Sequence, residues 1–121
     1  MTRLLNFLFV VAGLCCVAAA EDEAMVTLSG DDIRALLTDN TAIYEDGARQ
    51  FFAADGSTLY REPGRAVSEG TWRVKDNLYC SRWGISNRPL PETCYQMERQ
   101  GKRITWDKEY PARIAEGNVF H

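Results

Sequence analysis

Residues 70–83 decide the fold, and they read Gly-Thr-Trp-Arg-Val-Lys-Asp-Asn-Leu-Tyr-Cys-Ser-Arg-Trp. Apolar and polar side chains alternate on both sides of the central Asp-Asn pair, with Trp72 beside Val74 on one face and Tyr79 beside Trp83 on one face. Alternation with a period of two indicates half-buried strands, and an Asp-Asn pair between them indicates a turn. The stretch therefore predicts two antiparallel strands joined by a short turn.

Similar short runs, separated by turn residues, occupy most of the chain on either side. Asp-Gly pairs follow two of the runs and Pro63-Gly64 follows a third, and Asp-Gly between apolar runs is a strong hairpin signal. We expect strands at 41–45, 50–54, 58–61, 71–75, 78–83, 94–99, 102–107 and 113–115. Turns at this spacing predict a mainly β domain, an antiparallel meander forming a small barrel that is closed or half-open.

One short helix precedes the strands. Ser29 can cap its first turn, and Asp32 stands three residues later, as in a capping box. Ile33, Leu36 and Leu37 share one face of a helix. The pattern predicts a helix over 30–38 with one apolar stripe to bury.

The first 20 residues have the pattern of a secretory signal peptide. Arg3 gives a positive start, residues 7–17 are an uncharged apolar run, and Ala18 and Ala20 form a small-residue cleavage site. We expect cleavage after Ala20, a flexible leader over 21–27 and a single exported domain over 28–121. The expected location is the periplasm or the exterior.

Two other readings of the N-terminus remain open. An uncleaved membrane anchor would need about 20 apolar residues, and this run is shorter. A lipid anchor would need a modified cysteine after a small residue, whereas Cys15 follows Leu14 and Cys16 follows Cys15. Cleavage and release without a stable membrane span is the preferred interpretation.

Cleavage leaves two cysteines, Cys80 and Cys94, which can pair within the chain in only one way. An exported protein meets an oxidising compartment, so we expect a disulfide between them. Their spacing is unlike that of a redox pair, and two cysteines with one histidine do not make a structural zinc site. No metal or cofactor is expected.

The charge argues against a nucleic-acid partner. The full chain has a net charge of -3, and binding to phosphates requires a cationic surface. Residues 21–69 carry eleven acidic and four basic side chains, whereas residues 70–121 carry nine basic and six acidic ones. Either the two halves mix in the folded sheet, or a basic face binds an anionic ligand.

Catalytic motifs are weak. The one histidine, His121, is the last residue, so a serine or cysteine triad is not expected. Glu69, Glu98 and Asp107 could supply a carboxylate pair for a small hydrolase, but their spacing singles out no pair. No catalytic residue is assigned.

Aromatic side chains on the expected strands are the remaining lead. They either fill a small core or line a cup that has basic groups at its mouth. The candidate ligand-facing residues are the aromatic Trp72, Tyr79, Trp83, Tyr95 and Trp106 and the basic Arg73, Arg82, Arg99 and Arg103.

The chain also resembles a known group of proteins. The pattern is Gly70-Thr71-Trp72, then Leu78-x-Cys80-x-x-Trp83, then Cys94-Tyr95, within a span from Leu28 to Asn118. It resembles a family of small exported proteobacterial proteins of unknown function. The resemblance implies export, a mostly β domain and a Cys80–Cys94 bridge, and it brings no activity or substrate.

Three functions follow as hypotheses. The first is a non-catalytic exported binding module for a small molecule, without nucleic acid as a partner. The second is a structural or interaction protein of the cell envelope, which would present an edge strand or the loop 84–93 to a protein partner. The third is the carboxylate hydrolase.

Overall fold

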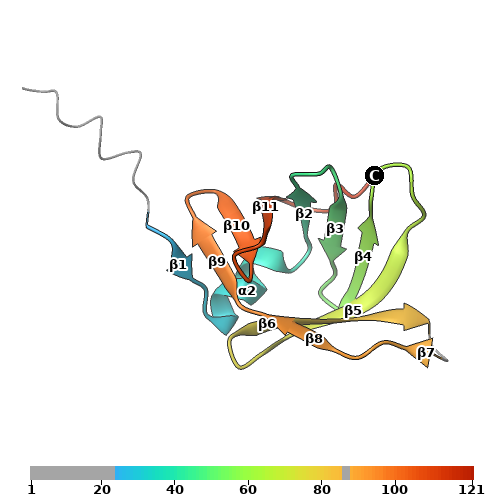
Figure 1. Ribbon diagram of the computed structural model, residues 1–121, viewed down its shortest axis with the longest axis horizontal. Helices are drawn as coiled ribbons and strands as arrows, with labels where there is room; N and C mark the ends of the chain where they lie inside the picture. Colours follow the sequence, from blue (N-terminus) through green and yellow to red (C-terminus); the bar gives the residue numbers. More distant parts are fainter. Residues whose placement is uncertain (1–23, 86–87) are drawn as a thin grey trace, which may run out of the picture.

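The computed structural model describes residues 24–85 and 88–121 (Figure 1). The expected signal peptide, 1–20, and the first residues of the expected leader lie outside the described part. The described elements are β1 (Val26–Thr27), α2 (Gly30–Leu37), β2 (Asn40–Tyr44), β3 (Arg49–Phe52), β4 (Ser57–Arg61), β5 (Ser68–Lys75), β6 (Leu78–Ile85), β7 (Arg88–Pro89), β8 (Thr93–Tyr95), β9 (Met97–Gln100), β10 (Arg103–Trp106) and β11 (Tyr110–Ala115).

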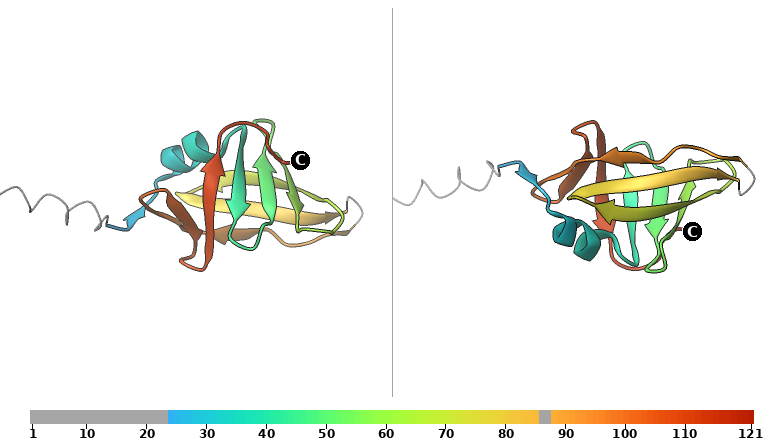
Figure 2. Two further views of the ribbon diagram at one scale, coloured as in Figure 1. Left: turned by 90° about the horizontal axis from the view of Figure 1, so that it is seen from above. Right: turned by 90° about the horizontal axis from the view of Figure 1, so that it is seen from below.

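The strands form one antiparallel sheet that is not closed. Their order is β1-β9-β10-β11-β2-β3-β4-β5-β6-β7, and β8 pairs with β6 beside this path. Seen from above and below, β2, β3 and β4 cross the long β5–β6 hairpin at a steep angle (Figure 2). The prediction of a mainly β domain with one short helix is confirmed, in its half-open form.

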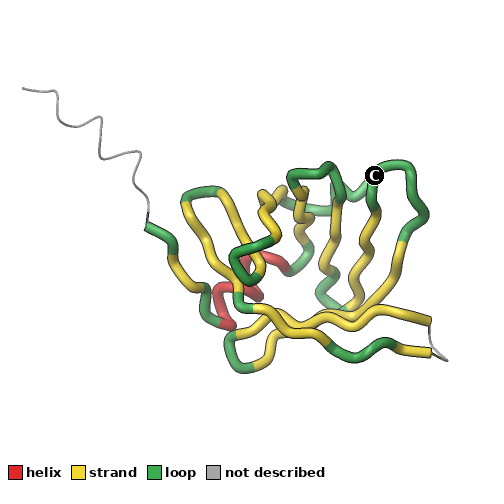
Figure 3. The backbone as a smooth tube through the Cα atoms, viewed as in Figure 1, coloured by secondary structure: helices red, strands yellow, loops and turns green. Residues whose placement is uncertain are grey.

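The helix begins and ends where the sequence indicates, within one residue. Ser29 Oγ accepts from the backbone N–H of Asp32, and Asp32 Oδ2 accepts from the backbone N–H of Ser29, so the capping box is present. Ile33 and Leu37 are fully buried. The helix packs against β2, β5 and β6 beside the β5–β6 turn (Figure 3), where it covers one end of the strands.

The core lies where the apolar stripe of α2 meets the inner face of the sheet. Phe52, Trp72 and Tyr79 form edge-on or stacked ring contacts there, with centroid separations of 5.5 to 6.4 Å. Cross-strand partners share a face of a sheet, and Trp72 pairs with Ser81 while Val74 pairs with Tyr79. The alternation in residues 70–83 therefore predicted the inward face correctly.

Three segments differ from the sequence-based assignment, and β5 and β11 each begin three residues earlier than expected. Val26–Thr27, at the end of the expected leader, pairs with β9. The expected strand 94–99 is two strands, since β8 pairs with β6 whereas β9 pairs with β10. The expected loop 84–93 contains β7 and the end of β6. Strand pairing over long distances along the chain decides these boundaries, and short-range periodicity does not report it.

The mixing of the two halves of the chain is also visible in the sheet. β4, from the acidic half, pairs with β5, and β2 pairs with β11 from the basic half. The described ranges contain no helix of membrane-spanning length and apolarity.

Candidate functional site

A cavity of about 1130 Å³ opens at the end of the strands away from α2. The helix sits at the start of β2 and at the β5–β6 turn, where the backbone N–H of Gly30 donates to Asn77. Most lining residues lie toward the opposite ends of these strands, whereas Tyr79, the second residue of β6, and its partner Tyr95 lie near the β5–β6 turn. We call this cavity the aromatic cup; it is lined by Tyr44, Asp46, Gln50, Tyr60, Val67, Ser68, Glu69, Tyr79, Ser81, Trp83, Gly84, Leu90, Tyr95, Trp106 and Tyr110.

All five tyrosines and two of the three tryptophans of the chain line the cup. The seven rings form an unbroken series of neighbours whose centroids are 5.4 to 6.4 Å apart. In order, the series is Trp83, Tyr60, Tyr44, Trp106, Tyr79, Tyr95 and Tyr110. Such rings are rigid and give a binding surface that is apolar on its faces and polar at the hydroxyl or indole N–H.

The sheet register brings these rings to one side. Trp106 pairs with Tyr110, and Tyr79 pairs with Tyr95, so each pair shares a face. Gln50 on β3 pairs with Tyr60 in the same way, so its side chain lies on the same face as the rings. The sequence segments that meet in the cup are far apart along the chain.

Gln50 forms hydrogen bonds with Tyr44, Thr58 and Tyr79, and we call these four residues the polar floor of the cup. Its Oε1 accepts from the Tyr44 hydroxyl at 2.7 Å, and its Nε2 donates to Thr58 Oγ1 at 3.0 Å and to the Tyr79 hydroxyl at 2.9 Å. The Gln50 side chain is buried, so these bonds replace the water that it loses on folding. Both its donor hydrogens are used within the protein.

Burial keeps the floor phenols neutral. It raises the pKa of Tyr79 to about 12, against the opposing effect of hydrogen bonds with Ser81 and Gln50. The pKa of Tyr44 is raised well above its usual value, first by burial and then by the neighbouring Tyr79. A neutral phenol can both donate and accept, which suits a floor shared with a buried amide.

Trp83 stands in the cup wall because Gly70 lies beneath it. The two residues are cross-strand partners on β5 and β6. A Cβ atom on Gly70 would lie 2.5 Å from the carbonyl oxygen of Arg82 and 2.7 Å from Cε3 of Trp83. Gly70 therefore permits the ring to lie against the backbone of the neighbouring strand.

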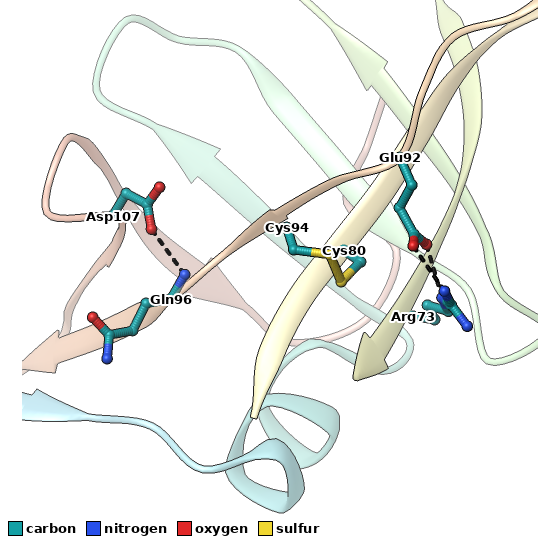
Figure 4. Close-up of a disulfide and its surroundings, with 6 residues drawn as sticks. All are labelled: Arg73, Cys80, Glu92, Cys94, Gln96 and Asp107. Atoms are coloured by element: carbon teal, nitrogen blue, oxygen red, sulfur yellow. Dashed lines mark hydrogen bonds and ion pairs between the residues drawn. A yellow bond between two sulfur atoms is a disulfide. The ribbon is translucent and has the colours of Figure 1, made fainter. Parts of the chain in front are cut away.

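The β8 wall carries Tyr95 and is attached to β6 by a short ladder and the Cys80–Cys94 disulfide (Figure 4). Beside the disulfide, Arg73 donates to both carboxylate oxygens of Glu92 at 2.7 and 2.8 Å, and these bonds lower the pKa of Glu92. Covalent and ionic links on the outer face thus hold a wall whose inner face lines the cup.

The junction between β8 and β9 is also held. Asp107 accepts from the backbone N–H of Gln96 at 2.8 Å, and the backbone N–H of Asp107 donates to the Gln96 carbonyl at 2.7 Å. Figure 4 shows the first of these bonds on the far side of the disulfide from Glu92. This link lets one continuous segment change its pairing partner from β6 to β10.

Trp106 carries a buried donor that is not used. The residue is 3% exposed, and its Nε1 has no hydrogen-bond partner among the described residues. By contrast, Trp72 Nε1 donates to the Ala53 carbonyl at 2.9 Å. A buried donor without a partner costs free energy.

Four of the five aromatic residues expected to face a ligand line the cup, namely Tyr79, Trp83, Tyr95 and Trp106. Trp72, the fifth, is outside the lining and packs in the core against Phe52. Whether any of them contacts a ligand stays a prediction.

The four arginines expected at the mouth are outside the lining. Arg73 pairs with Glu92 on the outer face, and Arg103 lies 3.6 Å from Glu45 in an exposed ion pair. Arg82 and Arg99 are exposed. The strand alternation explains Arg73 and Arg82, because each follows an inward-facing residue and so points outward.

The carboxylates named for a hydrolase are not gathered in the cup. Glu69 lines it, but Glu98 is buried and bonded to Thr105 Oγ1, and Asp107 holds the Gln96 backbone. Ligand-type atoms of Cys80, Glu92 and Cys94 lie within 4.8 Å of one another, but both sulfurs belong to the disulfide and are not thiolates.

The candidate residues named from the sequence lacked three lining tyrosines, Tyr44, Tyr60 and Tyr110. Tyr44 alternates with the buried Ala42 on β2, which is a local signal for an inward side chain. Tyr110 pairs directly with Trp106, and only the β10–β11 register reveals it. Comparison with known proteins adds no further site, because no family model, curated protein or solved structure matches the chain.

Proposed function

We propose that this chain is an exported binding module that holds a small organic molecule in the aromatic cup without converting it. The observation that carries the proposal is the cup itself, in which seven linked rings surround a buried polar floor. Ligand sites are typically concave, mostly apolar and supplied with a few placed polar groups. The cup has this composition, and its volume suits a small organic molecule.

Exposed apolar groups at the mouth also favour a bound ligand. Val67, Leu90 and Tyr110 are exposed, and all three line the cup. An exposed apolar side chain next to a cavity is stabilised when a ligand removes it from water.

Export is part of the proposal. The N-terminal Arg3, the apolar run and the Ala18-x-Ala20 exit support a cleaved signal peptide. The Cys80–Cys94 disulfide is compatible with an oxidising compartment. The interaction-protein hypothesis shares these features, so binding of a small molecule is the property that separates the two.

Ligand-dependent stability tests the proposal. Thermal and urea unfolding of the mature protein would be followed with choline, 3,3-dimethyl-1-butanol, 3,3-dimethylbutanoate or glucose. A compound that binds only the folded state stabilises it by about 2.7 kcal/mol at a concentration of 100 times its Kd. We expect at least one compound to stabilise the protein in a saturable way.

Two truncations locate the effect. Trp83→Ala removes a lining ring and should abolish the ligand-dependent stabilisation, whereas Leu59→Ala removes a half-buried side chain outside the lining and should preserve it. Absence of stabilisation with all four compounds, or equal loss in both variants, would contradict a small-molecule site in the cup.

A further inference from the structure

Two acidic residues, Asp46 and Glu69, line the cup, and no lysine, arginine or histidine with a described side chain does. Glu69 pairs with Leu59, outside the lining, so alternation turns its side chain outward and leaves Asp46 as the carboxylate at the cup. The adjoining hollow, lined by Tyr60 and Ser68 among others, contains Arg65 together with Glu62, so its two charges offset each other. A cavity with this lining attracts cations and repels anions.

Carboxylates near the cup also raise the pKa of two of its tyrosines. Burial is the first cause of the raised pKa of Tyr60, and Glu62 and Asp46 raise it further. Burial likewise raises the pKa of Tyr95, with additional contributions from Asp107 and Glu109 among others. Carboxylates thus lie near Tyr60, toward one end of the ring series, and near Tyr95, toward the other end.

The rings themselves favour a cation. Tyrosine and tryptophan present electron-rich faces, and a cation within about 6 Å of such a face is attracted to it. The cup contains tyrosine and tryptophan rings and no phenylalanine among its described lining residues. Several rings around one cavity, with a carboxylate at the rim, form the kind of environment that holds quaternary ammonium groups.

The floor offers little to an anion. Both hydrogens of the Gln50 amide are donated to Thr58 and Tyr79, so this amide has no free N–H. The other side-chain donors of the lining are neutral hydroxyls and indole N–H groups. An anion would therefore meet the Asp46 carboxylate with no opposite charge among the described lining side chains to balance it.

We propose that the ligand of the aromatic cup is an organic ammonium ion, with the cationic head against the rings and its charge balanced by Asp46. This inference rests on the proposed function and narrows it to one class of ligand. It replaces the expectation of a basic mouth for an anionic ligand.

Three compounds of similar shape and different charge test the inference. Choline is a cation, 3,3-dimethyl-1-butanol replaces its nitrogen by carbon, and 3,3-dimethylbutanoate is an anion. Calorimetric titration of the mature protein in low salt should show choline binding about tenfold more tightly than the neutral compound, by an ammonium–ring attraction that the isostere lacks. The anion should bind most weakly.

A charge-neutral variant assigns the effect to the rim. Asp46→Asn keeps the side-chain oxygen that accepts from the backbone N–H of Ala48. It should weaken choline about threefold to tenfold and leave the neutral compound unchanged. Glu116→Gln, an exposed change outside the lining, should affect neither compound.

The outcomes separate this inference from the proposed function. Equal or tighter binding of 3,3-dimethyl-1-butanol would overturn the ammonium assignment and leave the cup as a binding site. Tightest binding of the anion would overturn it in the same way. Failure of all three compounds would also overturn it, and stabilisation by glucose alone would then show a binding cup for another ligand class.

Discussion

At the scale of single residues, the floor of the cup depends on Gln50. Gln50→Leu would leave the Tyr44 hydroxyl, Thr58 and the Tyr79 hydroxyl without their amide partner in a buried setting. Loss of such partners costs more than the bonds themselves contribute. We expect the free energy of unfolding to fall by about 2 kcal/mol, measured by urea denaturation.

Gln96→Leu is the matched control, because it makes the same chemical change at an exposed side chain. Its effect should stay within about 0.5 kcal/mol. Similar losses in the two variants would mean that the Gln50 network contributes nothing specific.

Residue-scale features with local causes could be predicted from the sequence. The Ser29–Asp32 capping box and the shared inner face of Trp72 and Val74 depend on neighbours along the chain, and both are present. The same alternation also turns Arg73 and Arg82 outward, so the expectation that they line the mouth was wrong on local grounds. Tyr110 could not be predicted, because only the β10–β11 register places it beside Trp106.

At the scale of elements, β8 is the weakest part of the cup wall. Three cross-strand pairs attach it to β6, and Cys80–Cys94 is the middle one. The double change Cys80→Ser and Cys94→Ser should lower the free energy of unfolding by about 3 kcal/mol, since the bridge closes a loop with a sequence separation of 14 residues. Hydrogen exchange should accelerate at the backbone amides of β8 more than at those of β11.

Arg73→Met provides the comparison on the same face. It removes the bonds to Glu92, but Arg73 is exposed, and exposed ion pairs contribute about 0 to 1 kcal/mol. If the cysteine variant leaves exchange in β8 unchanged, the disulfide does not hold the wall.

The positions of the strands could be predicted from turn signals and alternation. Which strands pair with one another could not. The turn after β5 is visible in the sequence as Asp76-Asn77, and both residues adopt positive φ there. The break at Gln96 has no comparable signal, because it depends on Asp107 reaching its backbone from another hairpin. Local sequence patterns therefore predict where the strands lie better than they predict which strands pair.

At the scale of the whole molecule, the two ends of the sheet have different roles. α2 buries its apolar stripe at one end and forms the core with Phe52 and Trp72. Tyr44, Tyr60 and Tyr110 line the cup toward the other end, and Tyr79 and Trp106 belong to both the core and the cup lining. These shared rings let one small domain have a packed core that continues directly into a hollow.

The buried phenols make the stability of the molecule sensitive to alkali. The pKa of Tyr79 is about 12 in the folded state, above the usual value of 10.0 for tyrosine, so unfolding makes its proton easier to lose. Its contribution to stability is complete below about pH 10 and is lost as the pH rises toward 12. Urea unfolding at several pH values should show stability falling across this window.

Tyr79→Phe tests the origin of that fall. The variant should be less stable at neutral pH, because Gln50 loses a partner, but its stability should decline less steeply above pH 10. An equal slope in the variant and the parent protein would show that other groups cause the alkaline loss.

The indole N–H signals in a nuclear magnetic resonance spectrum report most directly on whether the aromatic cup binds a small molecule. The three tryptophans give three indole N–H signals, of which Trp83 and Trp106 report on the cup and Trp72 reports on the core. On titration with choline and with 3,3-dimethyl-1-butanol, we expect the Trp83 and Trp106 signals to shift in a saturable way while the Trp72 signal does not move. Three unmoved signals with both compounds, or a Trp72 shift as large as that of Trp83, would contradict it.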